Sequence, residues 1–134
     1  MKENLESLTY YRLEQADESL DSAQLLFDNG KYRSSVSRSY YAMFYAVLSL
    51  LVFTGNRTSK HSGAISLFNR EFVKSGIFDK EFSQWLSEAF DLRQRADYQE
   101  MFTLSEGRAK TVLENARIFI KGVKEKVQNM MPKS

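Results

Sequence analysis

The chain has no cysteine, one histidine and one proline in 134 residues. Without cysteine it can hold neither a disulfide framework nor a thiolate metal site, and a single histidine excludes a histidine-rich metal cluster. We therefore expect no metal and no cofactor. Six glycines and the one proline, Pro132, leave few helix breakers, and this scarcity favours an all-helical fold.

An excess of one charge is also absent, because 19 basic residues face 17 acidic ones and the net charge is +2. This balance neither requires nor excludes a nucleic-acid partner. The N-terminal segment MKENLESLTYYRLEQ is charged and shows no apolar signal-peptide core, so we expect a cytoplasmic protein. The length predicts one domain, residues 1–134, with an ordered core of about residues 3–128.

The chain is organised around residues 38–53, RSYYAMFYAVLSLLVF, and two apolar stripes run through this region at helical spacing. One stripe comprises Val36, Tyr40, Met43, Val47 and Leu50, and its neighbour comprises Tyr41, Phe44, Leu48 and Leu51. A helix that packs on one neighbour needs a stripe of roughly 100°, and this helix offers nearly twice that width. It should therefore lie at the centre of a bundle or reach a second subunit. We expect a homodimer interface at Tyr41, Phe44 and Leu48.

The apolar run in this central helix is about fourteen residues, short of the roughly twenty that span a bilayer. We therefore expect a core helix without membrane contact. The preceding helix is predicted for residues 3–28, and Asn29-Gly30 is a strong stop signal. Its heptad seam consists of Leu13, Ala16, Leu20, Ala23 and Phe27. Because only a short link through Lys31 follows, the two helices should be antiparallel neighbours.

Three more helices follow in the periodic pattern. A shorter helix, capped by Ser59 or Ser62, should end at Gly76. A long helix should start with Asp79 as its N-cap, and a second long helix should open at Ser105. The sequence therefore predicts an all-α, up-and-down four-helix bundle with an extra short helix inserted between the second and fourth helices.

The fourth helix carries a second stripe beside its main seam, and this stripe begins apolar and ends in charges: Leu86, Phe90, Arg93 and Asp97. One interpretation is an intrahelical salt bridge, because Arg93 and Asp97 stand four residues apart. The other is a phosphate-binding site in which Arg93 offers its guanidinium fork, Asp97 orients it, and Tyr98 stacks or donates a hydrogen bond. The sequence favours neither interpretation strongly.

His61 has a reference pKa near neutrality and is the default general base if the protein has one. The alternative, a capping or loop histidine, is the more common case and is favoured here. Arg57 and Lys60 stand beside it in a basic loop that offers phosphate contacts, although such loops are common. The tyrosine pairs at positions 10–11 and 40–41 are more typical of core and interface than of a base-stacking platform. The sequence contains no Gly-rich phosphate loop, Ser-His-Asp set or HExxH motif.

Three separated motifs carry a family resemblance: SYYAMFYAVLSLL at 39–51, KHSGAISLFNREFVKSGIF at 60–78 and FDLRQRADY at 90–98. Over roughly Ala16 to Lys121 the chain resembles the HEPN domain, and more narrowly the small stand-alone HEPN proteins of the UPF0332 type. The resemblance implies an up-and-down four-helix bundle with an extra short helix, usually assembled as a homodimer.

The resemblance also implies a functional setting. Many prokaryotic HEPN proteins are paired with a minimal nucleotidyltransferase in toxin–antitoxin or defence loci. Active members are metal-independent endoribonucleases that use an Arg, a spacer of four to six residues and a His. The dimer brings two such motifs together in one cleft.

This chain departs from that motif at the histidine. The positions that the spacing allows after Arg93 or Arg95 hold Tyr98, Gln99, Glu100, Met101 and Phe102. The RQRADY form at residues 93–98 resembles the stand-alone subgroup instead. Tyr98 and Asp97 are poor general acids or bases at neutral pH unless strongly perturbed. His61 can approach Arg93 only if the inserted loop folds over the site.

Three functions stay open on this basis. The leading hypothesis is a homodimeric binding module for a nucleotide, RNA or a nucleotidyltransferase partner, with phosphate contacts from Arg93, Asp97, Tyr98, Arg57, Lys60 and His61. The second is a divergent endoribonuclease in which Arg93 stabilises the phosphorane while His61 or Tyr98 moves protons. The third is a purely structural interaction protein in which Arg93 and Asp97 form a bundle salt bridge.

Overall fold

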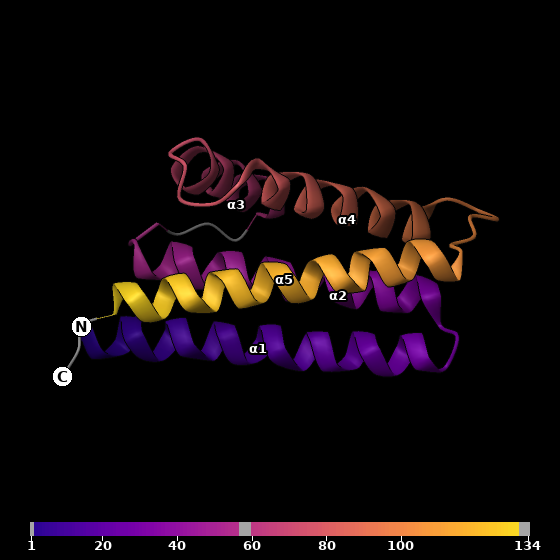
Figure 1. The fold of residues 1–134 in the computed structure, drawn as a ribbon, viewed down its shortest axis with the longest axis horizontal. Coiled ribbons are helices and arrows are strands. Elements are labelled where there is room, and N and C mark those ends of the chain that lie inside the picture. The colour runs from indigo at the N-terminus through magenta and orange to yellow at the C-terminus, as the bar shows by residue number, and fades with distance from the viewer. Residues whose placement is uncertain (1, 57–59, 132–134) are drawn as a thin grey trace.

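The elements of the computed structural model follow the helical prediction. It describes residues 2–56 and 60–131, and these contain helices and turns but no strand. In chain order they are α1 (Lys2–Asp28), α2 (Tyr32–Phe53), α3 (His61–Phe68), the π-helix η1 (Asn69–Val73), α4 (Lys80–Tyr98) and α5 (Glu106–Met130). The predicted all-α fold, with a short helical segment between longer helices, is confirmed (Figure 1).

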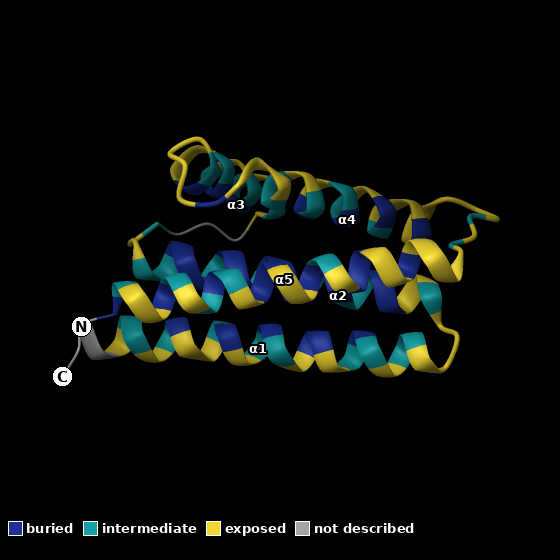
Figure 2. Cartoon of the chain, viewed as in Figure 1, coloured by how far each residue is buried: buried dark blue, intermediate teal, exposed yellow. Residues whose placement is uncertain are grey.

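Helix α2 is the centre of the fold because α1, α3, α4 and α5 all contact it. Helices α1 and α4 lie on either side of it and do not contact each other, whereas α5 contacts α1, α2 and α4 (Figure 1). Both predicted stripes contribute to the core: Val36, Tyr40, Met43, Val47 and Leu50 are fully buried, and Phe44 and Leu51 are nearly so. Figure 2 shows the buried faces turned toward the interior of the bundle.

By length and composition, the 22-residue α2 is apolar enough to cross a membrane, which the shorter apolar run did not indicate. However, 61% of its most apolar stretch is buried inside the bundle, as is also found in the core helix of a folded domain. The helices around it therefore already cover most of its apolar surface.

The turn between α1 and α2 is tight and uses the predicted stop signal. Gly30 adopts φ +73°, a left-handed conformation that side chains with a Cβ rarely take. The amide of Lys31 donates to the carbonyl of Leu26 at 2.8 Å, which closes the end of α1. This turn makes α1 and α2 antiparallel and places the start of α2 beside the end of α1.

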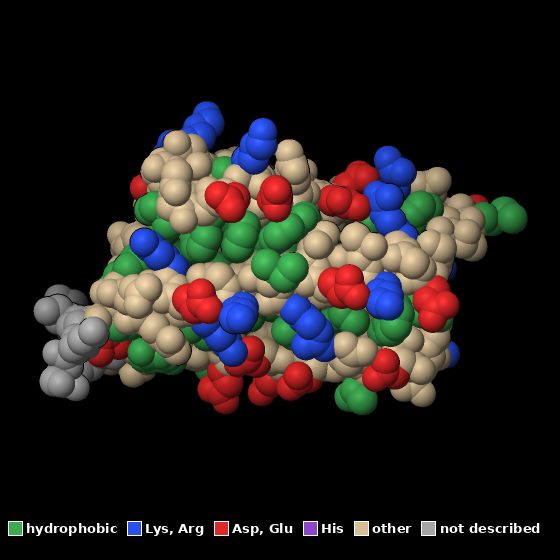
Figure 3. Space-filling view, in the orientation of Figure 1, with side chains coloured by type: hydrophobic (Ala, Val, Ile, Leu, Met, Phe, Trp, Pro, Cys, Tyr) green, Lys and Arg blue, Asp and Glu red, His purple; other side chains and the backbone are tan. Residues whose placement is uncertain are grey.

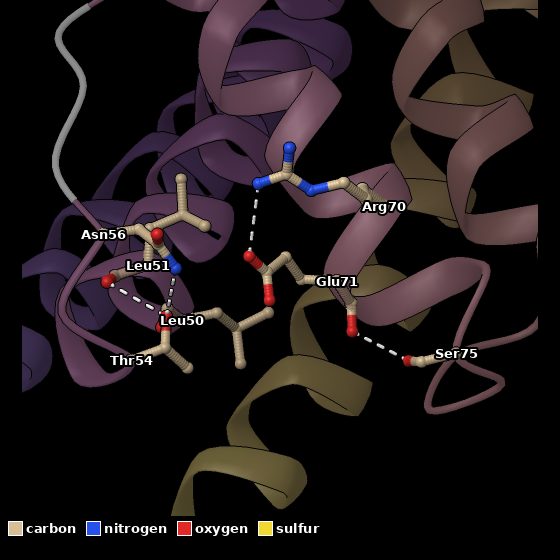
Figure 4. Close-up of polar contacts among 7 residues, drawn as sticks. All are labelled: Leu50, Leu51, Thr54, Asn56, Arg70, Glu71 and Ser75. Atoms are coloured by element: carbon tan, nitrogen blue, oxygen red, sulfur yellow. Dashed lines mark hydrogen bonds and ion pairs between the residues drawn. The ribbon is translucent and has the colours of Figure 1, made fainter.

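Polar side chains complete the end of α2 and the end of the short helical segment (Figure 4). Thr54 Oγ1 donates to the carbonyls of Leu50 and Leu51 at 3.1 and 3.2 Å, and Asn56 Nδ2 donates to Thr54 Oγ1 at 3.1 Å. Beyond η1, Ser75 Oγ donates to the carbonyl of Glu71 at 2.7 Å. The Thr54 bonds add to the amides of Thr54 and Asn56, which already donate to the carbonyls of Leu50 and Leu51 at 3.0 and 2.9 Å.

The predicted N-cap was right for α4 and differs at α3, and α5 begins directly after Ser105, where the sequence predicted that it opens. Asp79 and Ser105 are the N-cap residues of α4 and α5, and Ser105 Oγ accepts from the amide of Arg108 at 3.1 Å. The N-cap of α3 is Lys60, without a side-chain cap bond, and Ser62 lies inside the helix. Ser59, the other proposed cap, lies outside the described residues. Helix α5 also runs past residue 128, where we expected the ordered core to end.

Candidate functional site

His61 begins α3 and packs directly on α2. Its Nδ1 lies 2.7 Å from Oη of Tyr40, within hydrogen-bond distance. Its ring stacks on that of Phe44 with centroids 4.0 Å apart and planes 1° apart, and it meets the ring of Tyr41 edge-on at 5.8 Å. The histidine is thus part of the contact between α2 and α3.

Arg93 reaches the same tyrosines from α4. Its guanidinium carbon lies 5.6 Å from the ring centre of Tyr40 and 5.2 Å from that of Tyr41, within the range of a cation–π interaction. Its side chain is only 15% exposed, and Nε lies 3.3 Å from Oδ2 of Asp97. That ion pair lacks hydrogen-bond geometry, so the buried Nε has no hydrogen-bond partner. The guanidinium is therefore positioned by the rings of Tyr40 and Tyr41 and by the carboxylate of Asp97.

The structure thus brings His61 and Arg93 together around Tyr40 and Tyr41. Burial lowers the pKa of His61 below its ordinary value, and the positive charge of Arg93 lowers it further. Burial raises the pKa of the Tyr40 phenol beyond its ordinary range, an effect that Arg93 partly offsets. At neutral pH the site therefore contains a neutral imidazole, a protonated phenol and a guanidinium.

A hollow of 540 Å³ opens beside Asp97, between α1, α2 and α4; we call it the arginine hollow. It is lined by Leu26, Arg33, Ser34, Ser37, Arg38, Ala96 and Asp97. Arg33 donates a hydrogen bond to the carbonyl of Ala96 near the end of α4. The guanidinium carbon of Arg38 lies 4.9 Å from the ring centre of Tyr41. Arg33 and Arg38 therefore line one concave surface, and Asp97 on its wall pairs with Arg93.

Sequence reasoning missed Arg33 and Arg38, although the chain contained a signal for them. The first turns of α2 read YRSSVSRS, a polar start to an otherwise apolar helix. Arg33 and Ser37, like Ser34 and Arg38, stand four residues apart and so share a helix face. The apolar stripes of this segment carry no information on where its polar face points.

Other residues predicted for the site lie elsewhere. Tyr98 is 78% exposed and lines a separate hollow of 490 Å³ with Asp91, Gln94, Arg95 and Gln99. Lys60 is exposed at the start of α3, and Arg57 lies outside the described residues. Among the residues that the structure describes, no three His, Asp or Glu side chains are grouped as a metal site.

The three residues expected at a dimer interface differ in accessibility. Tyr41 and Leu48 are half-buried on α2, whereas Phe44 is 5% exposed and lies under the His61 ring. Tyr45, between them at helical spacing, is also half-buried. We call Arg38, Tyr41, Tyr45 and Leu48 the open stripe of α2, since they follow one helix face at steps of three and four residues.

Comparison with known proteins adds a family and named relatives. The family model described as HEPN domain matches residues 9–126. A "UPF0332 protein" of Thermotoga maritima is 37% identical over 130 residues, which cover 97% of this chain and 98% of the relative. "Putative toxin MJ0142" of Methanocaldococcus jannaschii is 35% identical over 124 residues, or 92% of this chain and 82% of the relative. "Putative toxin MJ0605" of the same organism is 30% identical over 119 residues, with 89% and 88% covered.

Proposed function

The chain belongs to the HEPN domain family and is related to proteins named as toxins, and from this premise we propose that it is the RNA- or nucleotide-binding member of a toxin–antitoxin system. The observation that carries the proposal is the arginine hollow, in which Arg33 and Arg38 stand next to the pair Arg93–Asp97. The similarity to these relatives supports the toxin–antitoxin context, and the arginines of the hollow support binding of a phosphate.

The hollow suits a phosphate because its arginines outnumber its one acidic group. The carboxylate of Asp97 is engaged by Arg93, so it does not neutralise Arg33 or Arg38. Guanidinium groups bind phosphate through two parallel N–H donors, and such charge-assisted bonds are about twice as strong as neutral ones. Ser34 and Ser37 add hydroxyl groups to the same wall. These contacts read the backbone of a nucleic acid rather than its bases.

The proposal includes the assembly that the family resemblance implies. The protein acts as a homodimer in the cytoplasm and pairs with a minimal nucleotidyltransferase as its antitoxin partner. The open stripe of α2 supports self-association, because it leaves Tyr41, Tyr45 and Leu48 partly uncovered along one helix face. Arg38 lies at one end of this stripe and also lines the arginine hollow.

The proposal is tested by the binding of a fluorescently labelled single-stranded RNA, measured by anisotropy at several salt concentrations. We expect Arg38→Ala to lower affinity by about tenfold and the salt slope by about one, since it removes one phosphate contact. Arg93→Ala should weaken binding too. The matched control is Arg70→Ala, which removes an equal charge from an exposed pair with Glu71. Wild-type affinity in both Arg38→Ala and Arg93→Ala would refute the site.

One observation favours RNA cleavage as a second candidate function. The neutral His61 and the guanidinium of Arg93 contact the same two tyrosines. His61 serves as a base only if Nδ1–H donates to Oη of Tyr40, since this tautomer leaves a lone pair on Nε2. Nε2 would then take the proton of a ribose 2′-hydroxyl, whose oxygen bonds to the adjacent phosphorus while Arg93 stabilises the phosphorane. The bond to the 5′-oxygen then breaks, and this oxygen takes the proton from the His61 imidazolium, which leaves a 2′,3′-cyclic phosphate.

Cleavage is distinguished from binding by incubating total RNA with the protein in EDTA. An active nuclease cleaves RNA under these conditions, and either Arg93→Ala or His61→Ala abolishes cleavage. If the wild-type protein binds RNA and leaves it intact, the binding function stands and this second candidate is rejected.

A further inference from the structure

A second hollow adjoins the arginine hollow and differs from it in chemistry. It has a volume of 360 Å³ and lies where the turn between α1 and α2 meets the link between α4 and α5. Arg33 and Ser34 line both hollows, so the two are neighbours along the start of α2. Its other walls include Tyr32, Phe102 and Leu104, and we call it the aromatic hollow.

The aromatic hollow is held open by side chains that are anchored in the bundle. Tyr32, Phe102 and Leu104 are half-buried and pack against the hydrophobic core. The ring of Tyr32 also contacts that of Phe27, with centroids 5.4 Å apart. Each wall therefore has one side fixed in the core and one side facing the hollow. Such half-buried aromatic side chains provide rigid surfaces for a flat ligand.

The conformation of the link between α4 and α5 places Phe102 at the aromatic hollow. Met101 adopts φ +59°, which a residue with a side chain rarely takes, and is 96% exposed. The next residue, Phe102, turns back onto the hydrophobic core. The strained conformation thus points Met101 outward and lets Phe102 line the hollow. Observed strain of this kind is a reason to suspect a functional role for the link.

From this arrangement we infer that the aromatic hollow is a nucleobase subsite, filled by one base of a single-stranded RNA whose phosphates bind Arg33 and Arg38. The inference rests on the proposed function and adds to it the class of ligand and the position of one base. Every base offers a π-face that stacks on an aromatic side chain regardless of sequence. Thr103 and Ser34 line the same hollow and offer hydrogen bonds to the edge of the base.

Two arginines that line one hollow can hold neighbouring phosphates of a single strand. Arg33 and Arg38 leave α2 at positions five residues apart, and both line the arginine hollow. The base attached near Arg33 then faces the aromatic hollow. A duplex keeps its bases paired and stacked inside, so only an unpaired base can enter the subsite.

Charge also argues for RNA as the occupant. Lys31 and Arg33 line the aromatic hollow, and its lining contains no acidic residue. An apolar peptide segment gains nothing from these cations, whereas a nucleotide places its phosphate on them and its base on the rings. A phosphate-bearing ligand with one flat apolar group matches both features.

The test compares a short single-stranded RNA with an oligomer of the same backbone that lacks bases, using fluorescence anisotropy. We expect the wild-type protein to bind the base-bearing strand more tightly. Phe102→Ala should weaken binding of that strand by about tenfold and leave the abasic oligomer unaffected. Phe102→Leu, which keeps an apolar side chain without the ring, guards against a folding defect and should show the same selective loss. The matched control is Ile118→Ala, which removes an exposed apolar side chain of α5 that lines neither hollow and should affect neither ligand.

The outcomes separate the inference from the function on which it rests. If the wild-type protein binds neither oligomer, the proposed function fails and the subsite fails with it. If it binds both oligomers equally, or if the Phe102 variants weaken both alike, phosphate binding stands and the base subsite is overturned. A duplex of the same sequence should compete poorly with the single strand, and equal competition would also overturn the inference.

Discussion

At the scale of single residues, Tyr40 connects the hydrophobic core with the polar site. Its ring is fully buried in α2 and contacts Phe44 and Phe90, as expected of a core aromatic residue. Yet its hydroxyl bonds to His61 and its ring lies under Arg93. The residue that makes α2 a core helix therefore also fixes the positions of the two strongest candidate groups in the site.

The charge of Arg93 should be measurable at His61, the single histidine of the chain. Nuclear magnetic resonance titration of its ring should give a pKa below the reference value of about 6.5, because of burial and the positive charge of Arg93. Arg93→Gln should raise this pKa toward the reference. In the wild-type protein, the lowered pKa of His61 means that the unfolded chain binds the proton more readily than the folded one. The stability that neutral His61 provides is therefore complete above about pH 6.5 and decreases as the pH falls below it.

Arg95→Gln is the matched control for this titration. Arg95 lies on the same helix, pairs with Asp91 at 3.2 Å, and both side chains are more than half exposed. Its removal should leave the pKa of His61 unchanged. An Arg93→Gln protein with the wild-type pKa would show that the two groups do not interact through the tyrosine pair.

The sequence identified His61 and Arg93 as candidates but did not indicate whether the two side chains lie close together. Their proximity depends on how the chain connects α2 to α3, and residues 54–60 show no periodicity that would predict this. Tyr98 was named because it belongs to the RQRADY segment, but it stands five residues after Arg93 and therefore faces another side of α4. Arg33 and Arg38 became visible only when the structure placed them beside Asp97.

At the scale of helices, apolar periodicity predicted the packing faces well. Leu13, Ala16, Leu20 and Ala23 of the expected α1 seam are buried, as are Ala89, Leu92 and Ala96 of α4. The widening of the short helix into the π-helix η1 was not predictable in this way. Within η1, Phe72 packs its ring on those of Phe68 and Phe78, and these contacts form only in the assembled core.

Packing between α4 and α5 depends on a glycine inside a helix. A Cβ built on Gly122 would lie 2.9 Å from Cζ of Phe82, whose ring also packs on Phe78, Trp85 and Phe119. The ring has little room to move, so we expect Gly122→Ala to lower the free energy of unfolding by about 1–3 kcal/mol. Urea denaturation followed by circular dichroism measures this change.

Gly107 provides the matched control in the same helix. Nothing lies within 4 Å of a Cβ at that position, so alanine meets open space. Because alanine favours a helix over glycine, Gly107→Ala should leave stability unchanged or raise it by up to about 1 kcal/mol. Equal effects at both glycines would show that the Phe82 contact does not limit packing here.

At the scale of the whole molecule, a net charge of +2 provides little general attraction for an anion. Acidic and basic side chains alternate over the face formed by α1, α4 and α5 (Figure 3), in keeping with a net charge of +2. Attraction of an anion therefore depends on local convergence of arginines. The arginine hollow offers such convergence between α1, α2 and α4. Composition could not predict it, since a total charge carries no information on position.

The proposed assembly of two copies on the open stripe of α2 would link the oligomeric state to RNA binding. Arg38 belongs to both the stripe and the arginine hollow, so a two-fold contact along the stripe brings the hollows of both copies to one interface. A phosphate backbone then meets arginines from two chains. We therefore expect a mass of twice 15.6 kDa in solution, measured by light scattering after size exclusion.

Replacing Leu48 on this stripe should separate the copies, because Leu48→Arg places a charge in an apolar contact that desolvates it. The expected mass is that of one chain, and RNA affinity should fall because each protein then offers a single hollow. Ile118→Arg is the matched control, since Ile118 lies 52% exposed on α5, away from the stripe. Circular dichroism establishes that both variants keep their helices. A wild-type monomer would contradict the homodimer, and a Leu48→Arg protein that is still dimeric would place the interface on another surface.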